Sequence, residues 1–193
     1  MSYEERKYKS YEMIIKMLEY RKYNDIARLT DLSMENVIIK YNDDKYLILF
    51  FFKCNKIRTS IIRNILNVMM DTNINHVIFL YKNNITVTAK STIDTIMVDK
   101  KYKIESFTYD ETQYQLSTNI YVPKHTILSE EYAIEHVYDK YGYNKDIYPK
   151  IKETDVMVKY IGAIPGQLIE IHRMNVDSLQ EEISYRIVVK WKK

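Results

Sequence analysis

The sequence predicts an α/β (α+β) protein made of two small domains. The length of 193 residues exceeds the 100 to 150 residues that are most common for one domain. A strand, helix, strand pattern occupies the middle of the first part, and all three glycines and all three prolines follow residue 122. We therefore expect residues 1–120 to form a small mixed sheet flanked by helices, and residues 121–193 to form a small α/β domain.

The first domain is predicted to open with a helix over residues 2–23. Tyr11, Ile14, Ile15 and Leu18 follow the i, i+3, i+4, i+7 spacing that places apolar side chains on one helix face. Such a stripe favours packing of the helix against a sheet.

A central strand is predicted over residues 45–53, where the apolar run suits a strand covered on both faces. Helical spacing returns at 57–69, and 76–81 is again a buried strand, so the three elements suggest a parallel crossover unit. Beyond them we expect a loop at 85–87, a short helix at 91–97 and an edge strand at 103–108. Turns in this domain must use Asn and Asp, because it has no glycine.

The second domain is predicted to begin with a helix that has signals at both ends. Ser129 suits the N-cap and Gly142 suits a left-handed C-terminus. Asp155 suits the cap of a short helix through Tyr160, although the alternation at 156–159 fits a strand as well.

Two paired strands are predicted at the end of the chain. The Ile164, Pro165, Gly166 sequence suits a type II turn, and the segments 167–173 and 183–191 alternate between apolar and polar residues. They are separated by a polar segment, which favours a hairpin.

Composition excludes several functions. No apolar run reaches the roughly 20 residues that a membrane-spanning helix needs, and the N-terminus does not resemble a secretion signal. Cys54 is the only cysteine and the four histidines are scattered, so we expect no disulfide, no metal site, no cofactor and an intracellular location. The glycines fit no nucleotide-binding motif. The net charge of +3, carried by residues 1–120, leaves the partner open.

A stand-alone nuclease is an alternative that the acidic residues support weakly. Asp43, Asp44 and Lys45 match the residue spacing of a nuclease motif, but they precede the predicted strand. Catalytic carboxylates need separate rigid elements aimed at one substrate. We therefore expect no catalytic residues.

A polar loop with two cations follows the second buried strand. It contains Lys82, Asn83, Asn84, Thr86, Thr88 and Lys90. A solvated turn is one interpretation; the other is contact with nucleic-acid phosphates, because amide, hydroxyl and ammonium groups suit backbone oxygens and read no bases. Two lysines supply only weak, salt-sensitive binding.

The last third of the chain resembles a known family, the small assembly subunit of multisubunit RNA polymerases, which archaea and eukaryotes share and which is the fifth subunit in eukaryotes. The resemblance rests on residues in matching order. They are Val122, Pro123, Lys124, His125, Ser129, Tyr148, Pro149, Lys150, Ile151, Asp155, Tyr160, Gly162, Gly166, Ile171, Arg173, Tyr185, Arg186 and Ile187.

The first part is similar to the jaw domain of the eukaryotic subunit, which archaeal members lack. The similarity covers the opening helix, the segment from Phe79 to Thr86, and Ile104, Glu105 and Phe107. The chain departs from the family at Val87 and Val156, where members have proline, and in the loop 175–178. The AT-rich residue usage and the divergent jaw favour a version from a large DNA virus, located in the nucleus, viral factory or virion.

The resemblance implies a non-catalytic subunit, present in one copy, whose C-terminal domain docks on the largest polymerase subunit beside neighbouring small subunits. The jaw would lie beside downstream double-stranded DNA, with weak contact to its backbone only, and no membrane would be involved. The implied DNA-proximal residues are Lys82, Asn83, Asn84, Thr86 and Lys90. The implied interface residues are Pro123, His125, Tyr148, Pro149, Lys150, Ile151, Tyr160, Gly162, Pro165, Gly166, Arg173, Tyr185 and Arg186. A rigid apolar surface suits a subunit interface, although Ile151 and Tyr160 equally suit the domain's own core. A further alternative is a free adaptor that binds transcription factors outside the polymerase.

Overall fold

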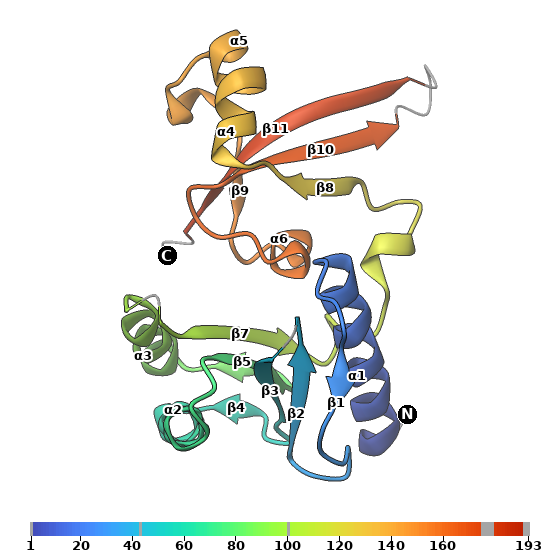
Figure 1. The fold of residues 1–193 in the computed structure, drawn as a ribbon, viewed down its shortest axis with the longest axis vertical. Coiled ribbons are helices and arrows are strands. Elements are labelled where there is room, and N and C mark those ends of the chain that lie inside the picture. Colours follow the sequence, from blue (N-terminus) through green and yellow to red (C-terminus); the bar gives the residue numbers. More distant parts are fainter. Residues whose placement is uncertain (1, 43, 100, 175–179, 191–193) are drawn as a thin grey trace. The chain divides into compact units, whose positions relative to one another are not determined.

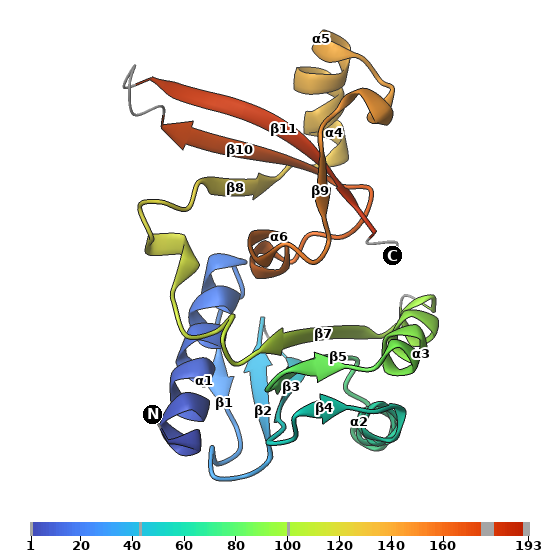
Figure 2. The same ribbon diagram turned by 180° about the vertical axis from the view of Figure 1, so that it is seen from behind.

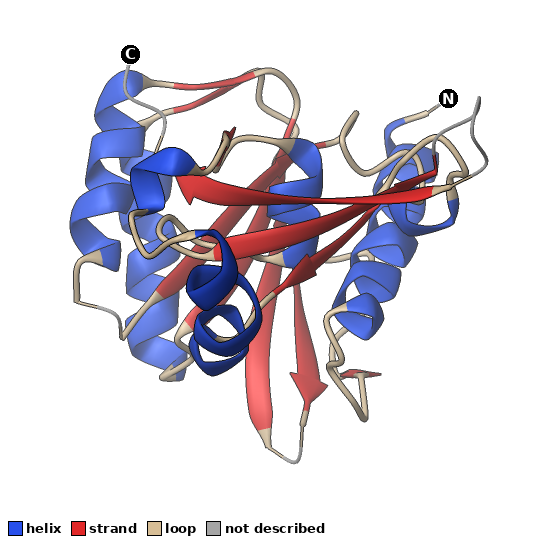
Figure 3. Cartoon of the chain, turned by 90° about the horizontal axis from the view of Figure 1, so that it is seen from above, coloured by secondary structure: helices blue, strands red, loops and turns tan. Residues whose placement is uncertain are grey.

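The computed structural model describes residues 2–42, 44–99, 101–174 and 180–190, and the chain folds as two compact units, 1–114 and 115–193 (Figure 1). Both units combine helices with strands (Figure 3), which confirms the predicted α/β class. The expected division after residue 120 falls inside the second unit, because residues 115–120 belong with it.

The first unit is built on a mixed five-stranded sheet in the order β1-β2-β3-β5-β7. Strands β1, β2 and β3 are antiparallel, whereas β3, β5 and β7 run parallel to one another. The strands are β1 (Ala27–Arg28), β2 (Asn36–Tyr41), β3 (Lys45–Phe51), β5 (His76–Tyr81) and β7 (Lys103–Thr108). The predicted central strand, the parallel crossover and the edge strand are confirmed, and the predictions missed β1 and β2.

Helices cover both faces of this sheet (Figures 1 and 2). On β3, Ile48 and Phe50 belong to a core cluster with α2 (Thr59–Thr72) and α3 (Val87–Met97). The opposite face of the strand carries Phe51. The Lys7 ammonium of α1 (Tyr3–Tyr20) lies 5.0 Å from the centre of the Phe51 ring. Burial on both faces explains why β3 and β5 are continuous apolar runs.

The helix boundaries follow local capping. Ser2 and Glu5 form a capping box at the start of α1, close to residue 2, the predicted start of this helix. Helix α3 begins at Val87, earlier than the predicted residue 91, because the Thr86 hydroxyl accepts a hydrogen bond from the Ala89 amide. The prediction of a loop at 85–87 is therefore wrong, and β6 (Asn84–Ile85) precedes the helix directly.

The turn between β2 and β3 uses the left-handed backbone that the absence of glycine requires. Asn42 has φ of 42°, and Asp44 has φ of 132° and pairs with Lys40 at 2.6 Å. Asp43, the other carboxylate of the nuclease alternative, lies outside the described residues.

A buried ionic network joins the end of α1 to the sheet. The Arg21 guanidinium donates two hydrogen bonds to Glu105 of β7, at 3.0 and 2.7 Å, and its side chain is only 4% exposed. His76 Nε2 and Lys103 Nζ lie 3.0 and 3.1 Å from the same carboxylate. Burial by itself would raise the pKa of Glu105, but Arg21 and His76 hold it well below its usual range.

The second unit is a four-stranded sheet in the order β8-β10-β11-β9. Only β9 and β11 are parallel, and β10 and β11 form the predicted hairpin. The strands are β8 (Lys124–Ile127), β9 (Lys150–Lys152), β10 (Leu168–Met174) and β11 (Glu181–Val189). One face packs on the helical segment formed by α4 (Glu130–Ala133), the π-helical turn η2 (Ile134–Tyr138) and α5 (Asp139–Tyr141).

The predicted caps and turn of this unit are confirmed. Ser129 caps α4, and Gly142 ends the helical segment with φ of 111°. Asp155 accepts hydrogen bonds from two amides at the start of α6 (Val156–Ile161), so the helix is formed and the strand alternative is wrong. The Gln167 amide donates to the Ile164 carbonyl at 3.2 Å, and Gly166 has φ of 95°, as a type II turn requires.

Short elements complete the connections. In the first unit the two-residue strand β4 (Lys56–Ile57) precedes α2, and in the second unit the 3-10 turns η1 (Leu116–Thr118) and η3 (Lys145–Ile147) precede β8 and β9. Among the residues with described positions, no helix has the length and apolar character needed to cross a bilayer. The same residues contain no group of His, Cys, Asp or Glu side chains arranged for a metal ion.

Replacing Glu105 with Gln is expected to destabilise the first unit by about 3–5 kcal/mol, because the Arg21 cation then lacks its buried partner. Urea unfolding followed by circular dichroism measures the loss. Glu12→Gln removes the same charge from an exposed position of α1 and should change the free energy of unfolding by less than about 0.5 kcal/mol. Equal losses in the two variants would contradict a buried network.

Stability should also fall as the pH drops below about 6.5. Burial lowers the pKa of His76, although Glu105 opposes this. His76 therefore binds a proton more readily in the unfolded chain than in the folded chain. The unfolded state then binds more protons, and unfolding becomes easier with acid. Urea midpoints at neutral and mildly acidic pH should differ, and the difference should shrink in His76→Gln but persist in His136→Gln, since His136 is exposed.

Candidate functional site

The predicted polar loop lies against a second segment of the chain. Strands β4 and β6 pair in parallel, with Lys56 opposite Asn84. The Asn84 amide donates to the Asn55 carbonyl at 3.2 Å, and the Thr86 amide donates to the Ile57 carbonyl at 3.0 Å. Because α2 follows β4 and α3 follows β6, the N-terminal ends of both helices lie next to each other.

Hydroxyl groups connect these two helix ends. Thr59 Oγ1 donates to Thr88 Oγ1 at 3.3 Å, and the hydroxyls of Thr86 and Thr88 are 3.2 Å apart. These bonds fix the positions of α2 and α3 at their first turns. The unpaired amides of a helix N-terminus favour anions, so both ends share one electrostatic preference.

The structure places the five predicted DNA-proximal residues on this surface. Lys82, Asn83, Asn84 and Lys90 are exposed. Thr86 is half-buried, and its hydroxyl accepts the capping hydrogen bond from the Ala89 amide. The sequence interpretation missed Lys56 and Arg58, which are also exposed. The sequence feature that could have pointed to Lys56 and Arg58 is the absence of Asp and Glu from residues 53–63. Only the pairing of β4 with β6 shows that these two residues lie beside the loop. We call residues 55–60 and 82–90 together the ribbon surface.

The predicted interface residues of the second unit differ in exposure. Three are buried, namely His125, Tyr148 and Tyr160. Five are exposed, namely Pro149, Lys150, Pro165, Gly166 and Arg173. Five are half-buried, namely Pro123, Ile151, Gly162, Tyr185 and Arg186.

The buried members hold the unit together. Tyr148 packs edge-on against Tyr138, and its hydroxyl donates to the Gly142 carbonyl at 2.7 Å, which fixes the end of the helical segment. Burial raises the pKa of Tyr148. The Tyr160 hydroxyl lies 3.1 Å from the Ser117 hydroxyl, which ties α6 to the start of the unit.

The two exposed prolines lie on segments that bond to opposite edges of β11, because this strand lies between β9 and β10 in the sheet. The Ile187 amide donates to the Pro149 carbonyl at 3.0 Å, and the Gly166 amide donates to the Val188 carbonyl at 2.9 Å. Lys145 Nζ also reaches the Gly166 carbonyl at 3.3 Å. We call Pro149, Lys150, Ile164, Pro165 and Gly166 the proline surface.

Strand β11 also carries an unusual arginine. The Nε atom of Arg186 is inaccessible to solvent and has no hydrogen-bond partner within the described parts of the chain. Next to it in the strand, Tyr185 lies beside Tyr141 with ring centroids 6.0 Å apart, and burial raises its pKa. Both residues thus contribute more to packing than an exposed contact residue would.

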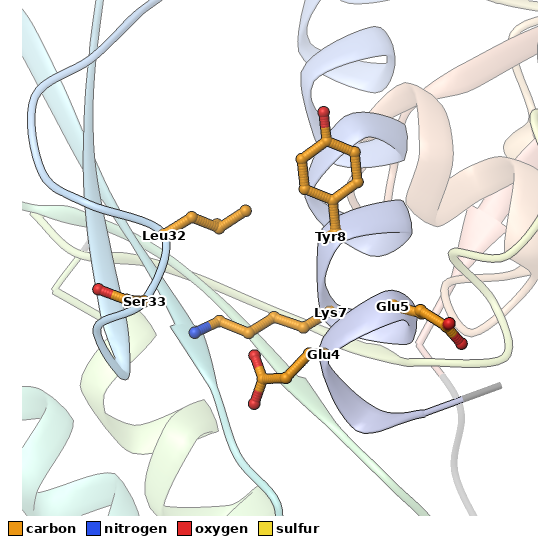
Figure 4. Close-up of a pocket in the computed structure, with 6 residues that line it drawn as sticks. All are labelled: Glu4, Glu5, Lys7, Tyr8, Leu32 and Ser33. Atoms are coloured by element: carbon orange, nitrogen blue, oxygen red, sulfur yellow. The ribbon is translucent and has the colours of Figure 1, made fainter.

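A pocket of about 410 Å³ lies elsewhere, in the first unit (Figure 4). It opens between the start of α1 and Leu32 and Ser33, and none of the predicted site residues lines it. Lys7 points across it, and its ammonium donates to the Met34 carbonyl at 2.7 Å. The lysine of this pocket is thus already engaged.

Comparison with known proteins gives matches for both units. Residues 114–188 match the model of the family described as RNA polymerase Rpb5, C-terminal domain. The DNA-directed RNA polymerase subunit Rpo5 of Archaeoglobus fulgidus is 39% identical over 40% of this chain and 99% of its own length. Subunit rpabc1 of DNA-directed RNA polymerases I, II and III from Dictyostelium discoideum is 25% identical over 91% of this chain and 93% of its own length. The corresponding Caenorhabditis briggsae subunit is 27% identical over 79% of this chain and 72% of its own length.

The resemblance of the last third of the sequence is therefore confirmed, and the match to the amoebal subunit extends it to the first unit. Almost the entire archaeal subunit is covered at 39% identity. On that coverage, the chain belongs to the family of RNA polymerase subunit 5, the family of Rpb5, RPABC1 and Rpo5.

Proposed function

We propose that this protein is a non-catalytic subunit of a DNA-directed RNA polymerase. The observation that carries the proposal is the coverage of its relatives. One archaeal subunit matches over 40% of this chain and 99% of its own length, and the amoebal subunit matches over 91% of this chain. Every one of these relatives is named as a polymerase subunit, so the function follows from the family rather than from a reaction centre.

The second unit docks on the largest polymerase subunit through the proline surface. Pro149 and Pro165 have fixed φ angles, and both flanking segments are bonded to β11, so little conformational entropy is lost on binding. Exposed Ile164 adds apolar area, and Lys150 supplies a charge at the rim. Neighbouring small subunits cover the remaining exposed positions, including Arg173.

The first unit lies beside downstream double-stranded DNA and contacts only its backbone. Lys82 and Lys90 supply charge, and Asn83 and Asn84 supply amide donors, all from exposed positions of the ribbon surface. Such groups position a protein on the duplex without reading sequence, and the contact is weak and salt-sensitive.

The finer assignments also belong to this proposal. The polymerase holds one copy of the chain, and the protein works where that polymerase works. The AT-rich residue usage and the divergent first unit favour a large DNA virus as its source, with the viral factory or virion as its location.

The docking proposal predicts that residues 115–193 alone enter the polymerase. The archaeal relative, whose 77 matched residues make up 99% of its length, is about as long as this unit and supports the choice of fragment. A pull-down with a tagged fragment should recover the largest subunit, whereas a tagged fragment of residues 1–114 should recover much less. Recovery by the first fragment no better than by the second would refute docking through this unit.

The DNA proposal predicts that replacing Lys82 and Lys90 with Ala lowers crosslinking of the subunit to downstream DNA in the assembled polymerase. Two fewer ammonium groups remove two phosphate contacts, so crosslinking should fall several-fold and become less sensitive to salt. Assembly, checked by co-purification of the large subunits, should not change. Unaltered crosslinking would show that the loop is an ordinary solvated turn.

A further inference from the structure

We infer that the first unit binds the DNA backbone with two segments of the chain, and that Lys56 and Arg58 supply the second set of phosphate contacts. This inference rests on the proposed function and extends it to residues that neither the sequence pattern nor the family resemblance singled out. The observation behind it is the unpaired positive charge that the β4–β6 pairing concentrates on the ribbon surface.

Strand pairing places the two segments side by side. Lys56 is the direct partner of Asn84, and paired strands lie about 4.8 Å apart. Arg58 follows β4 just as Thr86 follows β6, so the two residues occupy equivalent positions beside each other. The hydrogen bond between Thr59 and Thr88 continues the contact into the two helices.

The charge of this surface has one sign. Lys56, Arg58, Lys82 and Lys90 are exposed, and none of them forms an ion pair with any residue in the described ranges. The segments 53–63 and 82–93 contain no Asp or Glu. By contrast, Lys53 is next to Glu4, at 3.7 Å, so the unpaired charge begins only with Lys56.

The chemistry fits a phosphate backbone. The Arg58 guanidinium can bond two phosphate oxygens at once, whereas the lysines act as point charges. Exposed Ser60 and Thr88 add hydroxyl donors between the cations. Duplex DNA, with one charge per about 1.7 Å of its axis, meets all of these requirements.

Arg58 is available for this contact because folding does not use its side chain as a cap. It occupies the N-cap position of α2 but makes no capping hydrogen bond, so Arg58→Gln removes the charge without removing a cap. Lys56 pairs with β6 through its backbone. Both substitutions should leave the melting temperature unchanged, which separates loss of binding from loss of fold.

The test measures binding of the full chain to a short mixed-sequence DNA duplex by fluorescence anisotropy, from about 50 to 200 mM salt. The double variant Lys56→Gln, Arg58→Gln should bind roughly ten-fold more weakly, and the slope of log affinity against log salt should fall by about 2, since each phosphate contact contributes about 0.9. The matched control is Lys16→Gln, Lys45→Gln, which removes two exposed positive charges from other parts of the same unit.

Each outcome decides the inference. Normal binding by the Lys56, Arg58 variant, with weak binding by a Lys82→Gln, Lys90→Gln variant, overturns the inference and leaves the proposed function intact. Equal weakening by the control variant shows binding by net charge alone and also overturns it. Failure of the unsubstituted chain to bind duplex overturns the inference and the proposed DNA contact, and tight binding to an acidic polypeptide would then assign the surface to a protein partner. The polymerase-subunit proposal rests on the family and is tested by the pull-down.

Discussion

The parallel pairing of β3 with β5, and its continuation in β4 and β6, is the constraint on which the first unit depends. Parallel strands must be joined by a crossover, here α2, and a crossover helix begins at the edge where its preceding strand ends. As a result α2 and α3 begin beside each other, and the residues around both starts share one surface. The positively charged side chains of residues 55–60 and 82–90 lie together on this surface because the strand topology places them there.

The two units meet different physical demands. The first excludes water from a sheet covered on both faces, and it holds a buried ionic network around Glu105. The second has a smaller core, and glycines such as Gly142 and Gly166 take its positive φ angles, whereas the first unit uses residues such as Asn42 and Asn73 at such positions.

Much of the fold could be predicted because its signals are local. The boundaries of β5 follow from an uninterrupted apolar run, and α6 follows from its Asp155 cap. The start of α3 was missed because Thr86, Val87 and Thr88 are β-favouring residues whose capping role depends on one hydrogen bond. The burial of Tyr148 and Tyr160, and the proximity of Lys56 to Asn84, arise from tertiary contacts that no window of sequence contains.

The placement of charge fits the separate tasks that we propose for the two units. Residues 121–193 carry equal numbers of basic and acidic side chains, so the entire excess of +3 lies in the first unit. Stable docking on a protein depends mostly on apolar area and fixed geometry, which salt affects little, whereas contact with DNA depends on released counterions. On the proposed function, the neutral unit would stay docked on its protein partner while the weakly basic unit contacts DNA only weakly. A polymerase that moves along its template needs both properties at once, because a tight backbone contact would resist every step.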